Sequence, residues 1–298
     1  AINLFLEGFA ALGATVEEDA EGFRLTAKAL TGATIFLERQ SPTVTEALMM
    51  TATRARGTTR IENAALEPEI PALAAHLNAC GARISGAGTA TIIIEGVDKL
   101  SGGTVSLIPD RIEAATFVTL GLITKSDLTV SNCNPAHLTA LLDKLKKTGA
   151  KFEVGSDYIR TRTNGQLTAQ GVFTHEYPGF ATDAQPPYAV LMTQAQGQAL
   201  IHEPLFDGRL FYTDALRAMG ANIVMCDPHR VLVSGPTKLT GRYLSSPDIR
   251  AGIALVLAGL VADGTTIIDN AYQINRGYER ITERLANLGA AITRRDTQ

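Results

Sequence analysis

The stretch Leu73-Ala74-Ala75-His76-Leu77-Asn78-Ala79-Cys80-Gly81-Ala82-Arg83-Ile84 decides the fold, because its pattern occurs five times along the 298-residue chain. Leu73 and Leu77 have the four-residue spacing of the buried stripe of a helix. Gly81 follows where a helix ends, since glycine adopts the left-handed conformation at little cost. Ile84, three residues later, begins an expected strand. The Gly-Ala pair returns at intervals of 68 to 71 residues, which predicts one helix–glycine–strand unit copied about five times.

Each of the other copies places apolar residues eight and four positions before its glycine and three positions after it. They are Phe5, Phe9 and Val16 around Gly13; Leu141, Leu145 and Phe152 around Gly149; Tyr212, Leu216 and Ile223 around Gly220; and Ile281, Leu285 and Ile292 around Gly289. A turn and a short strand precede four of the glycines, at residues 57–61, 126–130, 197–201 and 264–268. No such strand precedes Gly13 and the chain does not begin with Met, so we expect further sequence upstream.

Composition limits the number of domains and the class of function. A chain of 298 residues with 45% hydrophobic and 19% charged residues is typical of a globular α/β protein with two cores. A net charge of −3 with scattered basic residues argues against a nucleic-acid partner. The longest apolar run, 253–262, is too short to span a membrane. The three cysteines form no CxxC pair, which favours the reducing cytoplasm.

The best candidate for a domain boundary is the segment from Ser101-Gly102-Gly103 to Ile108-Pro109-Asp110. Its glycines favour a turn and its proline fixes the backbone. We therefore expect a first domain over residues 1–108, with fewer than two of three repeats, and a second over residues 109–298, with three repeats.

Several common catalytic motifs are absent from the sequence. It contains no GxxxxGK[ST] loop, no HExxH and no GxSxG, and its five histidines are solitary. We therefore predict no metal and no cofactor. Four segments depart from the repeat pattern, and function is expected where local rules are broken. They are residues 178–187, 206–209, 246–251 and 275–280.

Each of these segments allows a structural and a functional interpretation. Asp183 is either a helix N-cap, as Thr182 also could be, or a reactive carboxylate, and Asp248 presents the same choice. Arg209 either pairs with Asp207 or binds a ligand. Arg250 is harder to explain structurally, because a cation in the first turn of a helix opposes the helix dipole. Arginine side chains bind phosphates and carboxylates bidentately, so these loops predict a site for a small polyanion.

At these residues the chain resembles the enolpyruvyl transferase family, in its sugar-nucleotide branch. The resemblance runs over essentially the full length. It rests on GTTRIENAA (57–65), EPEI (67–70), IPDRIE (108–113), PGFATD (178–183), Arg250-Ala251 with LVLAGL (255–260), and RGYERI (276–281). It implies a two-domain, inside-out α/β barrel of six β-α-β units with the active site between the domains. It also implies transfer of enolpyruvate from phosphoenolpyruvate to the 3-hydroxyl of UDP-N-acetylglucosamine. This is the first committed step of peptidoglycan synthesis, on which cell shape and division depend.

The resemblance also implies roles for particular residues. Asp183 would be the general base on the sugar hydroxyl and would touch the nucleotide sugar, and Asp248 would be a second proton carrier or would stabilise a cation. Arg209, Arg250 and Arg276 would hold phosphoenolpyruvate. Arg111, at the hinge, would also reach the sugar nucleotide. The remaining residues expected to line that ligand are Ala1, Ile2, Asn3, Leu4, Arg39, Gln40, Ser41, Pro42 and Leu205.

The chain also departs from the family pattern. The family's Lys-Asn pair and its flexible loop with a reactive Cys or Asp would lie upstream of Ala1. Asn3, Arg39 and Pro42 replace the commoner residues, so we expect altered nucleotide affinity and poor turnover by these residues alone. Two rival interpretations stay open: the sister enzyme acting on shikimate 3-phosphate, and a non-catalytic paralogue that binds a sugar nucleotide or scaffolds partners. The sequence does not indicate the oligomeric state.

Overall fold

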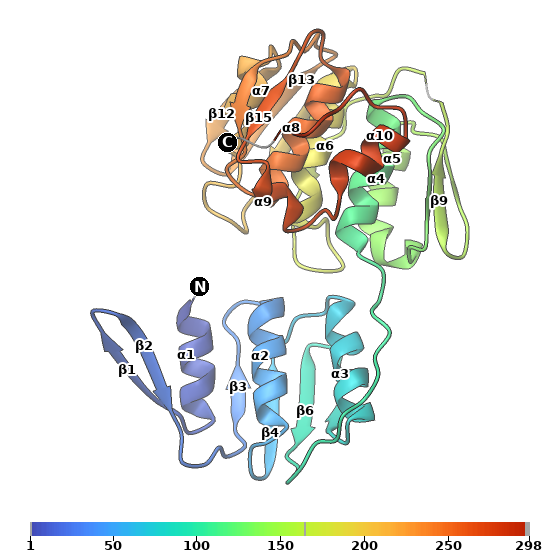
Figure 1. The fold of residues 1–298 in the computed structure, drawn as a ribbon. Helices are drawn as coiled ribbons and strands as arrows, with labels where there is room; N and C mark the ends of the chain where they lie inside the picture. Colours follow the sequence, from blue (N-terminus) through green and yellow to red (C-terminus); the bar gives the residue numbers. More distant parts are fainter. Residues whose placement is uncertain (1, 164, 296–298) are drawn as a thin grey trace. The chain divides into compact units, whose positions relative to one another are not determined.

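The computed structural model describes residues 2–163 and 165–295, and it consists of two compact units that divide between Ile108 and Pro109 (Figure 1). Each unit has its own hydrophobic core. Within the described residues, no helix is both long enough and apolar enough to cross a membrane.

Unit 1, up to Ile108, carries one four-stranded sheet and one separate hairpin. The sheet has the order β3-β4-β6-β5, in which β3 and β4 are parallel and the other neighbours antiparallel. Leu48 and Ile61 are fully buried in its core. The elements are α1 (Ile2–Ala11), β1 (Thr15–Asp19), β2 (Gly22–Thr26), β3 (Thr34–Phe36), α2 (Pro42–Ala52), β4 (Thr58–Glu62), α3 (Glu69–Ala79), β5 (Arg83–Ser85) and β6 (Thr91–Glu95).

The centre of unit 2 is made by three helices, α4 (Arg111–Ile123), α6 (Gln185–Gln194) and α8 (Ile249–Val261), which pack against one another. Their residues are buried along nearly their whole length. A helix that is apolar all round is stable only inside a protein, so these three helices form the core. Polar side chains that could contact a ligand are therefore expected at the ends of these helices and in the loops that lead into them.

Sheets and shorter helices surround this centre (Figure 1). The sheets have the orders β7-β9-β8, β10-β11-β13-β12 and β14-β15. The strands are β7 (Thr129–Ser131), β8 (Phe152–Val154), β9 (Tyr158–Thr161), β10 (Val172–Phe173), β11 (Gly197–His202), β12 (Asn222–Asp227), β13 (Arg230–Gly235), β14 (Tyr243–Ser245) and β15 (Ile267–Asp269). The helices are α5 (Thr139–Lys147), α7 (Tyr212–Ala218), α9 (Tyr272–Asn275) and α10 (Ile281–Asn287), with two 3-10 turns at Pro135–Leu138 and Thr182–Ala184.

The repeat predicted from the sequence is confirmed at the level of single residues. All five pattern glycines have positive φ angles, between 83° and 103°, as a helix-ending glycine requires. The sheets β3-β4-β6-β5 and β10-β11-β13-β12 share one topology, a parallel first pair followed by antiparallel neighbours. The mixed α/β fold built from repeated units is therefore as expected.

One predicted strand is wrong. The residues around Ile292 follow their glycine as in the other copies, but they form no strand. In the described part of the chain, the sheet nearest in sequence, β14-β15, has only two strands. A strand needs a hydrogen-bonding neighbour, and none of the described residues supplies one here. Ile292 instead packs, partly buried, against the unit 2 core.

Candidate active site

Asp183 lies between two arginines from different parts of unit 2. Its Oδ1 accepts a hydrogen bond from Nη2 of Arg209 at 3.2 Å, and its Oδ2 lies 2.9 Å from Nη2 of Arg250. The side chains are 30% exposed for Asp183, 16% for Arg209 and 19% for Arg250. The carboxylate therefore holds two guanidinium groups at a site that solvent can still reach.

The turn that presents Asp183 is built by the sequence around it. Asp183 lies in the 3-10 turn Thr182–Ala184, and α6 begins directly after it with Pro186 and Pro187 in its first turn. Proline suits the first turn of a helix because no backbone N–H is needed there. The helix has no side-chain cap, so the N-cap interpretation of Asp183 and of Thr182 is wrong. The Asp183 carboxylate does not cap a helix and pairs with Arg209 and Arg250 instead.

Arg209 comes from the loop between β11 and α7. Its guanidinium lies 4.9 Å from the centre of the Phe206 ring, an arrangement typical of a cation–π contact. Asp207 does not pair with it: the Asp207 side chain is 99% exposed, and its nearest basic group is Nε2 of His229, at 3.4 Å. The alternative in which Arg209 merely pairs with its loop neighbour is therefore wrong.

Arg250 is the second residue of α8, where the helix dipole disfavours a cation. Burial acts to lower the pKa of its guanidinium, but the charge of Asp183 and the hydroxyl of Tyr278 outweigh burial, so the pKa is raised above its ordinary value. Nη1 of Arg250 donates to the Tyr278 hydroxyl at 3.5 Å. The buried Tyr278 in turn hydrogen-bonds Thr116 at 2.8 Å. Arg250 is thus fixed by a carboxylate on one side and by the core on the other.

Asp248 caps α8. Its Oδ1 accepts hydrogen bonds from the backbone N–H of Arg250 at 2.7 Å and of Ala251 at 2.9 Å. This is the capping arrangement that satisfies the first N–H groups of a helix. The N-cap role of Asp248 is therefore confirmed and its reactive role stays a prediction; the same cap sets the position of the backbone from which Arg250 extends.

Three further predicted residues of unit 2 do not take part in the ion pairs of Asp183. Arg276 ends α9, is exposed and donates to Gln273 at 2.9 Å. Arg111 begins α4, and its guanidinium lies 5.6 Å from the ring centre of Tyr177, next to the turn that carries Asp183. Leu205 lies in the loop that carries Arg209 and is partly buried.

The predicted residues of unit 1 gather at one end of that unit, where α1 begins and where β3 leads into α2 (Figure 1). Ile2, Asn3 and Leu4 form the first turn of α1, and Arg39 and Gln40 lie in the loop after β3. Ser41 caps α2 by accepting from Val44 N–H at 3.5 Å, and Pro42 is the first helical residue. Ala1 lies outside the described residues.

Sequence reasoning missed Glu203, Thr116 and the position of Tyr278. Glu203 follows β11 and is fully buried, and a charged residue directly after an apolar strand is the signal that could have found it. Tyr278 belongs to the RGYERI string, but the string alone does not show that its hydroxyl meets Arg250. In the described ranges, no three His, Cys, Asp or Glu side chains gather as a metal site would need.

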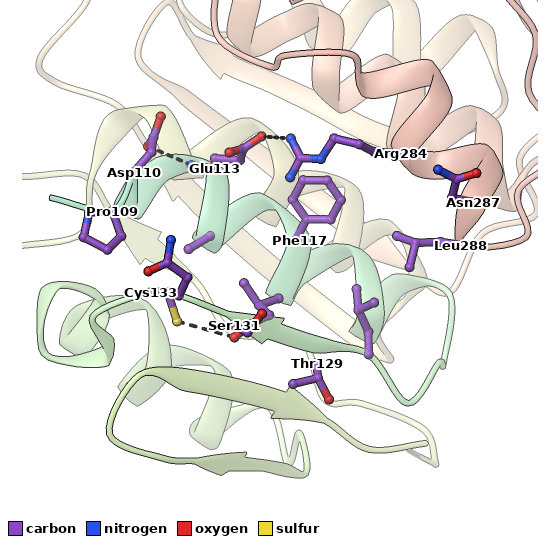
Figure 2. Close-up of a pocket in the computed structure, with 14 residues that line it drawn as sticks. Pro109, Asp110, Glu113, Phe117, Thr129, Ser131, Cys133, Arg284, Asn287 and Leu288 are labelled. Carbon is purple, nitrogen blue, oxygen red and sulfur yellow. Dashed lines mark hydrogen bonds and ion pairs between the residues drawn. The ribbon is translucent and has the colours of Figure 1, made fainter. Parts of the chain in front are cut away.

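A separate groove of about 470 Å³ lies between α4, β7 and α10 (Figure 2). An ion pair between Glu113 and Arg284 crosses it, and the Arg284 guanidinium lies 4.7 Å from the centre of the Phe117 ring. None of the predicted site residues lines this groove. The ion-pair cluster around Asp183 is therefore the better candidate for the active site.

Comparison with known proteins identifies the class. The sequence profile of the family described as EPSP synthase (3-phosphoshikimate 1-carboxyvinyltransferase) matches residues 2–285. The enolpyruvyl transferase NikO from Streptomyces tendae superposes with a TM-score of 0.91 at 27% identity, covering 100% of this chain and 73% of that one. EPSP synthase from Acinetobacter baumannii, at 20% identity and a TM-score of 0.74, covers 98% and 71% and shares the fold.

Curated relatives narrow the class further. UDP-N-acetylglucosamine 1-carboxyvinyltransferase from Acidobacterium capsulatum is 46% identical over 98% of this chain and 67% of its own length. The protein of the same name from Desulfosudis oleivorans is 44% identical, over 98% and 70%. The chain therefore belongs to the EPSP synthase family of enolpyruvyl transferases. Within that family it groups with the relatives named UDP-N-acetylglucosamine 1-carboxyvinyltransferase.

Proposed function

We propose that this protein transfers enolpyruvate from phosphoenolpyruvate to the 3-hydroxyl of UDP-N-acetylglucosamine and releases phosphate, a step in peptidoglycan precursor synthesis. The name shared by its relatives supports the choice of reaction. The observation that carries the proposal is the carboxylate of Asp183, held by Arg209 and Arg250 in a partly exposed cluster. Such a cluster supplies a base and an anion-binding group at one place.

Asp183 is the general base in this proposal. It takes the proton of the sugar hydroxyl while the hydroxyl oxygen bonds to the carbon of phosphoenolpyruvate that carries the phosphate. The double bond gains a proton at its other carbon, which becomes a methyl group. Phosphate then leaves from the tetrahedral intermediate while this methyl carbon gives a proton back to a base, and the double bond re-forms. Carboxylates serve as general bases when they lie within hydrogen-bond reach of the reacting proton. Asp248, at the start of α8, is assigned as the second proton carrier or as the stabiliser of developing positive charge.

Arg209, Arg250 and Arg276 are assigned to the carboxylate and phosphate of phosphoenolpyruvate. Guanidinium groups match both anions bidentately. They also stabilise charge that develops on the transferring group. Arg276 is exposed and makes one solvent-exposed hydrogen bond, to Gln273, so a ligand can recruit it by breaking that contact.

The sugar nucleotide is assigned to residues of both units. In unit 2 these are Arg111, Asp183 and Leu205. In unit 1 they are Ala1, Ile2, Asn3, Leu4, Arg39, Gln40, Ser41 and Pro42. We assign the reaction to the cytoplasm, because the three cysteines are unpaired thiols and such usage is typical of a reducing compartment.

The test compares Asp183→Asn with Asp207→Asn, a matched control in which an exposed carboxylate is neutralised in the loop that carries Arg209. Phosphate release is measured with UDP-N-acetylglucosamine and, separately, with shikimate 3-phosphate. We expect phosphate release with UDP-N-acetylglucosamine and none with shikimate 3-phosphate. We expect Asp183→Asn to lower the rate of this release by roughly 10²–10⁴-fold, the usual contribution of a general base. Binding of UDP-N-acetylglucosamine is measured by calorimetry beside turnover.

Three results would overturn the proposal. Release with shikimate 3-phosphate instead would identify the sister reaction. Equal rates for Asp183→Asn and Asp207→Asn would remove Asp183 from the chemistry, and sugar-nucleotide binding without any phosphate release would favour the non-catalytic paralogue.

A further inference from the structure

Glu203 is a fully buried carboxylate next to the candidate active site. It follows directly after β11 and is 0% exposed. Its Oε2 accepts a hydrogen bond from Oγ1 of Thr182 at 2.5 Å, and its Oε1 accepts one from the backbone N–H of Leu205 at 3.0 Å. Across the described residues, no Lys, Arg or His nitrogen lies within 4.0 Å of this carboxylate. Its partners are thus two neutral donors.

Those two donors belong to two of the three segments that make the candidate active site. Thr182 directly precedes Asp183 in the 3-10 turn, and Leu205 begins the loop that carries Arg209. One carboxylate therefore ties the turn that bears the proposed base to the loop that bears its arginine partner. The two segments are 21 residues apart in sequence, so no local secondary structure sets their spacing.

The backbone of Glu203 is itself fixed. Its N–H donates to the carbonyl of His229 at 2.7 Å, and Nδ1 of His229 donates back to the Glu203 carbonyl at 2.8 Å. His229 lies in the turn between β12 and β13, and β13 pairs with β11. The carboxylate is therefore anchored to the sheet, and the loop and the turn are anchored to the carboxylate.

A buried carboxylate is a poor means of stabilising a fold. Removing the charge from water is costly, and apolar residues of similar size commonly stabilise a core as well or better. An O–H···O distance of 2.5 Å lies in the range of charge-assisted hydrogen bonds, which are stronger and more directional than neutral ones. Such a bond fixes a geometry, and catalysis depends on geometry at the level of an ångström.

We propose that Glu203 is a positioning residue, which acts through Thr182 and the N–H of Leu205 to set Asp183 against Arg209 and Arg250. The inference rests on the proposed function, since it takes Asp183 as the base. Glu203 touches neither substrate; its effect on the reaction passes through the turn and the loop.

The test uses four variants. Thr182→Val removes the hydroxyl and keeps the shape, whereas Thr182→Ser keeps the hydroxyl. Glu203→Gln removes the charge, and the fourth variant combines it with Thr182→Val. Glu153→Gln, which neutralises a 49% exposed carboxylate on β8, is the matched control. Each variant is assayed for kcat/KM of phosphate release and for its fraction folded by urea denaturation.

We expect kcat/KM to fall at least tenfold in Thr182→Val and at least threefold in Glu203→Gln. The double variant should stay within twofold of Thr182→Val, because both changes break the same contact. Thr182→Ser should stay within threefold of the wild type and Glu153→Gln within twofold. A purely structural role would lower the fraction folded but leave kcat/KM per folded molecule unchanged, and that outcome would overturn the proposal. Effects that multiply in the double variant would also overturn it.

Crystal structures of Thr182→Val and Glu203→Gln separate this inference from the proposed function. If the wild type neither binds UDP-N-acetylglucosamine nor releases phosphate, the proposed function fails, and the positioning role is judged from the structures alone. We expect Asp183 to lie more than 4 Å from Arg209 or from Arg250 in Thr182→Val. Retention of both ion pairs in both variants would refute the positioning role.

Discussion

Tyr278→Phe tests how the core supports Arg250. The Tyr278 side chain is fully buried, and its hydroxyl meets Oγ1 of Thr116 at 2.8 Å and Nη1 of Arg250 at 3.5 Å. Removing the hydroxyl leaves Thr116 a partner, because its Oγ1 also donates to the carbonyl of Ile112 at 3.0 Å. The ring keeps its place, so no cavity forms.

The expected cost is therefore mainly that of the hydrogen bond to Thr116, because the contact with Arg250, at 3.5 Å, is at the limit of hydrogen-bonding distance. A typical net value is about 1 kcal/mol, with a range of roughly 0.5–1.5 kcal/mol. For a domain of the size of unit 2, this corresponds to a fall in Tm of about 2–4 °C. Arg250 keeps Asp183 but loses its link to the core, so we expect the KM for phosphoenolpyruvate to rise by about threefold, or roughly 0.65 kcal/mol.

The assay is urea denaturation monitored by circular dichroism, with Tyr158→Phe as the control. The Tyr158 hydroxyl also makes one hydrogen bond, to Glu153 at 2.6 Å, but on the surface. We expect the control to lose under about 0.5 kcal/mol, as exposed polar contacts usually do. A loss in Tyr278→Phe no larger than the control's would refute the reasoning. A loss above about 3 kcal/mol would refute it too, since it would mean that Thr116 is left unsatisfied.

Three further predictions concern other parts of the chain. Burial, with neighbouring carboxylates, raises the pKa of Glu46 in the folded state. Ionisation of Glu46 therefore destabilises the fold as the pH rises past the ordinary pKa of a glutamate. Glu46→Gln should raise Tm at pH 7 and not near pH 4, and an equal gain at both pH values would contradict this. A Cβ at Gly96 would collide with the backbone carbonyl of Ala55, so Gly96→Ala should lower the free energy of unfolding in urea by about 3 kcal/mol. A Cβ at Gly102 would meet only open space, so Gly102→Ala should leave that free energy nearly unchanged. Asp248→Ala should lose about 1 kcal/mol with its cap, while Asp248→Asn should keep the cap and lose phosphate release; full activity in Asp248→Asn would exclude a proton-carrying role.

The repeat could be predicted from the sequence because its signals are local. A helix stripe, a glycine that ends the helix and a short aliphatic strand each depend on a few neighbouring residues. All five glycines accordingly have the left-handed conformation. The strand expected at Ile292 failed because a strand also needs a neighbour, and pairing is a non-local property. The local pattern there matches the other copies, and only the sheet around it differs.

The candidate site could be predicted as a set of residues but not as a set of contacts. Asp183, Arg209 and Arg250 were singled out where their segments broke the repeat pattern, and the structure brings them together. Asp207 stands two residues from Arg209, and that closeness in sequence suggested the wrong partner. Glu203 was missed because its importance comes from Thr182, a residue 21 positions away. Contacts across such distances depend on how the strands and helices pack.

Arg250 shows why a broken local rule marks the site. A cation at the start of α8 opposes the helix dipole, and the cap from Asp248 reduces that conflict by placing a carboxylate at the same helix end. Asp183 offsets it further from outside the helix. Yet Asp183 carries one negative charge against the two positive charges of Arg209 and Arg250. Each guanidinium has five N–H donors, and Asp183 takes up only Nη2 of each, so further donors stay available in a partly buried place, where charges interact more strongly than in water. A structural ion pair needs no second arginine, whereas a site for an anion with a carboxylate and a phosphate does.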